Sequence, residues 1–227
     1  MKGGEELRRA KGVFFDLDGT LLDSLPGIAY SAQAAFAECG LPQRVVDLRG
    51  LIGPPIRRIL FNMSRDADER ELDALEAAFR ASYDSEGWMR TPHYPGAADA
   101  LRALKAEGKW LFVVSNKPRH ISLRILEEEG TLRLFDEVVT RDTRDPPYRD
   151  KLEMLVHLLR KWEMGAGDCL MVGDTIEDAQ AASETGMQFC LMTHGYGDVP
   201  PDTGVPVAFR LDRFSELMPG PAEEQSH

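Results

Sequence analysis

The sequence predicts an α/β protein whose parallel sheet is interrupted, after its first strand, by an all-helical insertion. Short apolar runs alternate with helix-length segments over most of the chain. A stretch of about 65 residues near the start contains helical periodicity and no convincing strand. Strands that alternate with helices are typical of a mainly parallel sheet covered by helices on both faces. We therefore expect one α/β core and one helical insertion.

The apolar runs are two to five residues long and are bounded by turn residues, as expected for buried strands. They lie at residues 13–15, 110–114, 138–139, 169–172, 189–192 and 207–209. The segments between the later runs have helical periodicity, at residues 97–107, 118–129, 150–162 and 176–185. This order of elements supports the predicted core.

The insertion is predicted to contain three helices. Apolar residues at helical spacing end at Gly40, which is placed to terminate the first helix, and Pro54 and Pro55 are placed to open the second. A third periodic segment includes Leu72, Leu75 and Phe79. We expect a core of residues 1–24 and 91–218, a helical cap of residues 25–90 and a disordered polar tail of residues 219–227.

The composition excludes several classes of partner. The chain has 227 residues and a formal net charge of −11, which argues against non-specific binding to nucleic acid or to an anionic membrane. Its three cysteines form no C-x-x-C pair, and the N-terminal residues lack the apolar core of a signal peptide. We expect a cytoplasmic protein with neither nucleic acid nor membrane as a partner.

Two aspartates follow the first predicted strand. Asp16 and Asp18 are spaced i, i+2, so an extended chain would place both on one face, and Gly19 then permits a sharp exit. Carboxylates this close together need a cation or a shared proton between them, and hard oxygen ligands suit Mg²⁺. An Asp-Gly turn between two strands would explain Asp18 and Gly19, but it gives no reason for Asp16 inside the apolar run.

Polar residues also follow two later strands. Ser115, Asn116 and Lys117 follow the second strand, and Asp174 follows the fourth, with Asp178 one helical turn later. Each could be an ordinary helix cap. In an open parallel sheet, however, ligands bind at the carboxyl ends of the strands, and all of these residues fall at that edge.

These motifs resemble the four ordered motifs of the haloacid dehalogenase superfamily. The resemblance rests on Asp16-Leu17-Asp18-Gly19-Thr20-Leu21, Ser115-Asn116, a lysine, and Gly173-Asp174-Thr175-Ile176-Glu177-Asp178. The helical insertion resembles that family's C1-type cap, and the stretches 23–27 and 115–118 are most similar to its phosphoglycolate phosphatase-like branch. The likeness covers about residues 13 to 196 and implies a Rossmann-like core.

The resemblance implies a role for each motif residue. Asp16 would be the nucleophile that forms an aspartyl-phosphate, and Asp18 the general acid and base. Asp16 and Asp174 would hold Mg²⁺, with the backbone carbonyl of Asp18 as a further ligand. Asp178 would orient metal-bound waters or the lysine.

The remaining motif residues would bind the phosphoryl group. Ser115 and Asn116 would donate hydrogen bonds to its oxygens, and Gly19 and Thr20 would belong to the turn that faces it.

The lysine position departs from the closest branch, which has a Lys-Pro dipeptide before the fourth-strand helix. Lys151 and Arg149 are the available cations, and we assign the phosphate role to Lys151, since a helix start disfavours a merely solvated lysine. Lys117 could face the non-phosphate end of the substrate or the solvent. The polar loop at residues 141–148 could form a wall of the site or be a surface loop.

Substrate specificity is expected to lie in the cap. Arg49, Arg57 and Arg58 fall in a segment that resembles the family's substrate-contacting cap loop, and a second anionic group on the substrate would explain them. We assign Arg49 to substrate binding and expect at least one of the three arginines to be solvated.

The sequence as a whole predicts a Mg²⁺-dependent phosphatase that hydrolyses a small, phosphoglycolate-like phosphate monoester through an aspartyl-phosphate. The partner would be a small phosphorylated metabolite, and the protein a monomer or homodimer. One alternative is a phosphosugar mutase of the same superfamily, which Thr20 disfavours because the mutases usually carry valine there. Another is a catalytically silent phosphate-binding or regulatory protein, against which the intact motif set argues.

Overall fold

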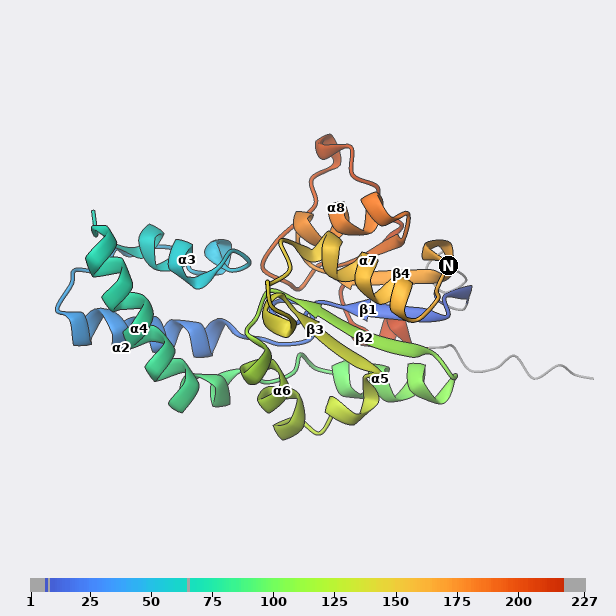
Figure 1. Cartoon of the computed structure of the whole chain (residues 1–227), viewed down its shortest axis with the longest axis horizontal. Coiled ribbons are helices and arrows are strands. Elements are labelled where there is room, and N and C mark those ends of the chain that lie inside the picture. Colours follow the sequence, from blue (N-terminus) through green and yellow to red (C-terminus); the bar gives the residue numbers. More distant parts are fainter. Residues whose placement is uncertain (1–6, 8, 65, 219–227) are drawn as a thin grey trace, which may run out of the picture.

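The computed structural model describes residues 7, 9–64 and 66–218. Its centre is a six-stranded parallel sheet in the order β3-β2-β1-β4-β5-β6 (Figure 1). The strands are β1 (Gly12–Phe15), β2 (Trp110–Ser115), β3 (Glu137–Thr140), β4 (Cys169–Gly173), β5 (Gln188–Met192) and β6 (Phe209–Leu211). The predicted α/β fold with a parallel sheet is therefore confirmed. The tail predicted for residues 219–227 lies outside the described residues.

The register of the central strands explains where the polar motifs meet. Phe15 at the end of β1 lies between Val113 of β2 and Val172 of β4. The amide of Asp16 then donates to the carbonyl of Val172, with an N–O distance of 3.0 Å. Because all three strands run in the same direction, the residues that follow them emerge at one edge of the sheet.

Helices cover both faces of the sheet. In Figure 1, α5 (Ala97–Ala106) and α6 (Arg119–Glu128) lie on one side, and α7 (Lys151–Lys161) and α8 (Ile176–Thr185) lie on the other. The side chains of β1 alternate accordingly: Val13 and Phe15 belong to one buried apolar cluster, and Phe14 belongs to the other. This two-sided burial explains why the strands are continuous apolar runs.

The segment between β1 and the second half of the core is helical, as expected. It contains α2 (Leu25–Cys39), α3 (Ile56–Met63) and α4 (Glu69–Ser85), and Figure 1 shows these helices as a lobe to one side of the sheet. Gly40 ends α2 with a left-handed φ of 64°, and Asp68 opens α4 with a capping box. We propose residues 25–90 as a cap, with the core made of residues 1–24 and 91–218.

The last strand differs from the sequence prediction. The apolar run at residues 207–209 suggested the strand itself, but β6 spans Phe209–Leu211, and Phe209 pairs with Cys190 of β5. Val207 instead packs against the buried cluster that contains Phe14. Val207 is half-buried, as Phe209 and Leu211 are within the strand, so the hydrophobic pattern does not mark where this edge strand begins.

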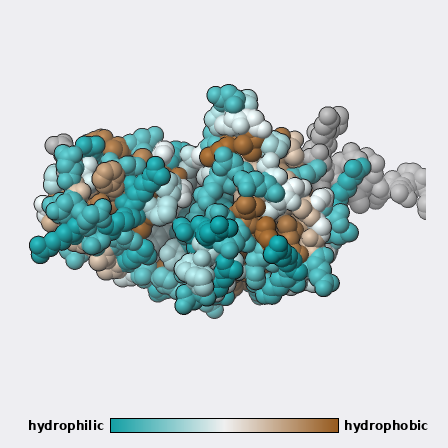
Figure 2. Space-filling view, turned by 45° about the horizontal axis from the view of Figure 1, so that its top comes forward, coloured by the Kyte–Doolittle hydropathy of each residue, from teal (hydrophilic) through white to brown (hydrophobic). Residues whose placement is uncertain are grey.

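The surface agrees with the acidic composition. Figure 2 shows a mostly hydrophilic face on which apolar side chains form small, separate patches. Among the helices of the described residues, none combines the length and apolar character needed to cross a bilayer.

Candidate active site

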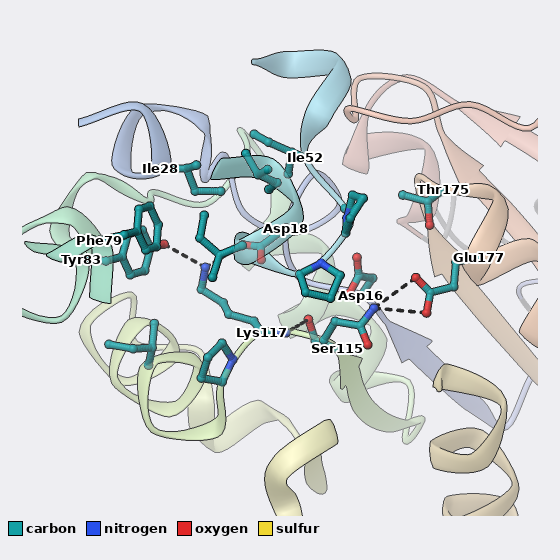
Figure 3. A pocket seen from close by; sticks show the side chains of 18 of the residues that line it. Asp16, Asp18, Ile28, Ile52, Phe79, Tyr83, Ser115, Lys117, Thr175 and Glu177 are labelled. Atoms are coloured by element: carbon teal, nitrogen blue, oxygen red, sulfur yellow. Dashed lines mark hydrogen bonds and ion pairs between the residues drawn. The ribbon is translucent and has the colours of Figure 1, made fainter. Parts of the chain in front are cut away.

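A cavity of about 170 Å³ lies between the carboxyl edge of the sheet and the cap helices (Figure 3). The core lines it with residues at or after the ends of β1, β2 and β4 and with the first residue of α7: Asp16, Asp18, Ser115, Asn116, Lys117, Lys151, Thr175 and Glu177. The structure thus brings together side chains that are up to about 160 positions apart in the sequence. This convergence was expected from the parallel sheet.

Three buried aspartates form the centre of the site. Asp16, Asp174 and Asp178 can each offer one carboxylate oxygen such that the three oxygens lie within 4.8 Å of one another. Lys151 is buried beside them, with Nζ 3.0 Å from Oδ1 of Asp16 and 2.5 Å from Oδ1 of Asp178. The group therefore contains three carboxyl groups and one ammonium group.

Asp174 is held by hydrogen bonds to both of its carboxylate oxygens. The hydroxyl of Thr20 donates to Oδ1 at 2.8 Å, and the backbone amides of Tyr196 and Gly197 donate to Oδ2 at 2.8 and 3.2 Å. The loop that supplies these amides approaches so closely that a Cβ at Gly195 would lie 2.1 Å from the Cβ of Asp174. Glycine is therefore required at that position.

The two predicted phosphate-facing residues after β1 also support Asp174. Gly19 has a φ of 85°, and a side chain there would lie 2.3 Å from Oδ2 of Asp174. Thr20 is fully buried, and its hydroxyl is hydrogen-bonded to that aspartate. Neither residue is among those that line the cavity, so their predicted contact with the phosphoryl group stays a prediction.

Burial and mutual repulsion disfavour the charged form of these carboxyl groups. Burial raises the pKa of Asp16 to about 8, and the neighbouring aspartates add to the effect, whereas Lys151 opposes it. Burial and Asp178 raise the pKa of Asp174 to about 6. Burial lowers the pKa of Lys151, but Asp16 and Asp178 raise it by more, so the ammonium stays charged. The cluster thus has more carboxylate charge than its one lysine can neutralise.

A divalent cation fits this donor set. Three carboxyl groups at this spacing provide hard oxygen ligands, which Mg²⁺ prefers, and a double positive charge would offset their repulsion. Two of the three predicted metal residues, Asp16 and Asp174, belong to the cluster. The carboxyl group of Asp18 does not, so a metal role for this residue would depend on its backbone carbonyl.

Asp178 is closely tied to its neighbours. Its Oδ1 accepts from Lys151, and its Oδ2 accepts from the backbone amide of Thr175 at 3.1 Å and from the hydroxyl at 2.6 Å. Asp178 therefore holds Lys151 in position. The sequence allowed two roles for Asp178, to orient metal-bound waters or to orient the lysine, and this contact corresponds to the second.

Lys117 connects the catalytic edge to the cap. It is only 6% exposed, and its Nζ lies 2.8 Å from Oδ1 of Asp18 and 2.8 Å from the hydroxyl of Tyr83 on α4. Burial lowers the pKa of Lys117, but Asp18 and Tyr83 raise it by more. The solvent-facing interpretation of Lys117 is therefore wrong, because its ammonium bridges a strand end and a cap helix.

The residues that follow β2 have partners within the site. The Ser115 hydroxyl is buried and accepts from the backbone amide of Lys117 at 3.3 Å. The amide nitrogen of Asn116 donates to both carboxylate oxygens of Glu177, at 3.2 and 3.1 Å (Figure 3). Oδ1 of Asn116 is buried with no hydrogen-bond partner among the described residues. Both side chains line the cavity, where a phosphoryl group could reach them.

The structure separates the two candidates for the phosphate-binding cation. Lys151 lines the cavity, whereas the Arg149 side chain is 82% exposed and lies 3.6 Å from Glu153. Residues 141–148 contribute nothing to the cavity, so the interpretation of this segment as a wall of the site is wrong. Of the two candidates, Lys151 is therefore the one positioned to act on a ligand there.

The cap arginines make contacts that the sequence did not predict. Nη2 of Arg49 donates to the carbonyl oxygens of His194 and Gly195, at 2.5 and 2.7 Å, and so joins the cap to the loop after β5. Arg57 is paired within the cap with Glu69, Asp73 and Glu76. Arg58 is exposed, as expected for at least one of the three. None of these arginines lines the cavity, so a role for Arg49 in substrate binding stays a prediction.

Sequence reasoning missed two parts of the site. The loop at residues 195–197 supplies the amides that hold Asp174, and its Gly-Tyr-Gly sequence directly after a predicted strand was an available signal. Tyr83 was not singled out, because nothing in the helical pattern around it marks it as a partner of Lys117.

Comparison with known proteins agrees with this geometry. Residues 13–192 match the family described as haloacid dehalogenase-like hydrolase. The chain belongs to this family. The resemblance inferred from the four motifs is therefore confirmed.

Several proteins that resemble the chain carry phosphatase names. Phosphoglycolate phosphatase of Nitrosospira multiformis is 33% identical over 194 residues, which cover 83% of this chain and 85% of the relative. A crystal structure of a predicted phosphoglycolate phosphatase from Haemophilus somnus has a TM-score of 0.82 and 27% identity and covers 92% of this chain and 96% of its own.

One solved relative carries a different name. The structure of Protein Tyrosine Kinase A from Mycobacterium tuberculosis has a TM-score of 0.77 and 30% identity, with 92% of this chain and 96% of that chain covered. The same hydrolase fold is thus found in proteins named for hydrolysis and in one named for phosphoryl transfer.

Proposed function

We propose that this protein is a Mg²⁺-dependent phosphatase that hydrolyses a small phosphate monoester through an aspartyl-phosphate on Asp16. The observation that carries the proposal is the buried group of Asp16, Asp174, Asp178 and Lys151, of which Asp16 and Lys151 line the cavity. Membership of the hydrolase family and the phosphatase names of the relatives support the same reaction.

In the first step, a carboxylate oxygen of Asp16 attacks phosphorus, and the bond from phosphorus to the ester oxygen breaks. Asp18 donates a proton to the departing alcohol oxygen. Its Oδ1 is engaged by Lys117, so we assign the transferable proton to Oδ2. Lys151 compensates the negative charge of the phosphoryl oxygens beside Asp16.

In the second step, Asp18 takes a proton from water, and the oxygen of that water attacks phosphorus. Inorganic phosphate leaves, and the Asp16 carboxylate is restored. Asp16 and Asp174 would hold Mg²⁺ with the backbone carbonyl of Asp18, and the bound ion supplies positive charge that offsets the phosphate and the carboxylates. Ser115 and Asn116 would orient the phosphoryl oxygens from the end of β2.

The cellular setting is part of the proposal. The three cysteines are free, as expected for a reduced cytoplasmic compartment. We also retain the sequence expectation of a small-molecule partner and of a monomer or homodimer.

The test is phosphate release from p-nitrophenyl phosphate and acetyl phosphate by the wild type and by Asp16→Asn. We expect Asp16→Asn to lose at least about 10³-fold in kcat, because the attacking oxygen is replaced by an amide group. Asp202→Asn is the matched control, since this exposed carboxyl lies outside the cavity. EDTA should abolish the wild-type activity and added Mg²⁺ should restore it. Near-wild-type turnover by Asp16→Asn would exclude Asp16 as the nucleophile.

Transfer to an acceptor other than water is a second candidate. It is favoured by the 30% identity to the structure named Protein Tyrosine Kinase A. The aspartyl-phosphate would be the same, and only the attacking hydroxyl would differ. Product analysis separates the candidates, because hydrolysis releases one inorganic phosphate for each ester consumed, and transfer gives a phosphorylated acceptor or an isomerised sugar phosphate.

A further inference from the structure

The cavity has a polar half and an apolar half. The core supplies the carboxylates and lysines described above, and the cap supplies a wall of branched and aromatic side chains. This apolar wall consists of Ile28 on α2, Ile52, Pro54, Pro55, Ile56 and Ile59 in and before α3, and Phe79 on α4. Figure 3 shows Ile28, Ile52 and Phe79 on the cap side of Asp18 and Lys117.

The wall is already packed. Ile28, Ile52, Ile59 and Phe79 are each 3–7% exposed and belong to the main buried cluster. These side chains therefore lose little conformational freedom when a ligand enters. An apolar group that fills the space would be removed from water, and this burial of its surface would favour binding.

Every positively charged side chain among the described residues that line the cavity already has hydrogen-bond partners. Lys151 contacts Asp16 and Asp178, and Lys117 is held between Asp18 and the hydroxyl of Tyr83. Arg80 donates from Nε and Nη2 to Oε1 of Glu76, at 3.2 and 2.6 Å.

Two further lining residues add negative charge. Asp84 lies on the cap side, and Glu177 lies beside Asn116. A carboxylate on the substrate, as in phosphoglycolate, would meet an apolar wall and no unpaired cation among these lining residues. Burying a charge without a partner is strongly unfavourable.

We propose that the leaving-group side of this cavity is built for an uncharged, largely apolar alcohol, so that the preferred substrate is the phosphate monoester of such an alcohol and not phosphoglycolate. The inference rests on the proposed phosphatase function and specifies its substrate class. It differs from the expectation that cap arginines bind a second anionic group: Arg57 is paired within the cap, and Arg49 donates to the loop after β5.

The first experiment compares kcat/KM, with Mg²⁺ present, for a series of n-alkyl phosphates from methyl to pentyl and for 2-phosphoglycolate. Full burial of one methylene corresponds to roughly a fourfold gain, so we expect kcat/KM to rise by up to about fourfold per carbon until the cavity is filled. Pentyl phosphate should exceed phosphoglycolate by at least about tenfold.

Acetyl phosphate distinguishes the two possible failures. Its acyl group is too small to fill the apolar wall, so its hydrolysis reports the phosphoryl chemistry alone. If acetyl phosphate is hydrolysed but phosphoglycolate exceeds every alkyl phosphate, the substrate inference is overturned and the phosphatase stands. If acetyl phosphate and all other esters are inert, the phosphatase proposal fails, and the substrate inference fails with it.

A second experiment changes the wall itself. Ile56 is the first residue of α3, is half-buried and lines the cavity, so Ile56→Arg would place an unpaired cation there. We expect the ratio of kcat/KM for pentyl phosphate to that for phosphoglycolate to fall at least about tenfold. Phe61→Arg is the matched control, because Phe61 lies on the same helix, is 54% exposed and does not line the cavity.

The control variant should keep the wild-type ratio. If Ile56→Arg does not fold, as judged by circular dichroism, Ile56→Ser tests the same contact by removing apolar surface, and the ratio should fall several-fold. An unchanged ratio in the folded Ile56 variant would overturn the assignment of the wall to the leaving group.

Discussion

Replacing the proposed nucleophile should stabilise the metal-free protein at alkaline pH. The pKa of the Asp16 carboxyl group is raised from 3.8 to about 8 in the folded chain, mainly by burial. Between these two values the folded state keeps a proton that the unfolded chain has released, so the free energy of unfolding falls as pH rises. Asp16→Asn has no such proton and avoids this loss.

The magnitude follows from the pKa difference. Each pH unit within the window corresponds to about 1.4 kcal/mol, so ionisation of Asp16 should cost the metal-free wild type about 4 kcal/mol of unfolding free energy between pH 5 and pH 8. Asp174, whose pKa is raised to about 6 by burial and by Asp178, is present in both proteins, so its cost of about 1 to 2 kcal/mol lowers both and cancels in the comparison. Between pH 5 and pH 8 without metal, Asp16→Asn should therefore lose about 4 kcal/mol less than the wild type.

Urea unfolding in EDTA at pH 5, 6, 7 and 8 measures this difference. Circular dichroism reports the helices, and fluorescence reports the three tryptophans, Trp88, Trp110 and Trp162. Mg²⁺ at about 100 times its dissociation constant should stabilise the wild type at pH 8 by about 2.7 kcal/mol. Asp202→Asn, an exposed change, should follow the wild-type curve. Identical pH profiles for the wild type and Asp16→Asn would refute the view that burial of this carboxyl group destabilises the metal-free site.

Three further substitutions test the contacts around the site. Lys151→Met should lower kcat for acetyl phosphate by roughly 10²- to 10³-fold with Mg²⁺ present, because it removes the ammonium beside the nucleophile. A near-wild-type rate would contradict the phosphate-binding role of Lys151. Tyr83→Phe should lower the unfolding free energy by about 1 to 3 kcal/mol, because Lys117 loses a buried hydrogen-bond acceptor. If urea unfolding gives the wild-type free energy, the contact between Lys117 and Tyr83 does not stabilise the fold. Gly195→Ala should lower stability and weaken Mg²⁺ binding measured by calorimetry, whereas Gly167→Ala, which has open space around it, should leave both within about twofold of wild type.

Most of the fold follows from local sequence patterns. The strands buried on both faces are continuous apolar runs, and the helix boundaries carry their own signals, such as Gly40 after α2 and Pro55 before α3. The exception was β6, where Val207 and Ala208 of the apolar run precede the edge strand. An edge strand has one neighbour and less burial, so the hydrophobic pattern specifies its position poorly.

The catalytic edge was predictable for a related reason. In a parallel sheet, the residues that follow adjacent strands emerge at one edge, so sequence position alone brings Asp16, Ser115 and Asp174 together. Lys151 was also predictable, because a lysine at a helix start is unfavourable unless something nearby compensates for it, and here two carboxylates do. The pairing of Lys117 with Tyr83 was not, because it depends on how a cap helix packs against the core.

The same limit explains why the substrate could not be inferred from sequence. Ile59 and Phe79 repeat at helical spacing, and that pattern is the same whether a side chain packs within the cap or also faces a cavity. The arginines appeared to be the better guide, since charge near a phosphate site suggests an anionic substrate. The carbonyl partners of Arg49 lie far away in sequence, and the carboxylate partners of Arg57 lie on the next helix. Only the folded chain shows that both guanidinium groups are already engaged. The residues proposed for catalysis therefore lie at the ends of the strands, where the sequence is informative. Selectivity depends on how the cap packs against those strand ends, which the sequence pattern does not show.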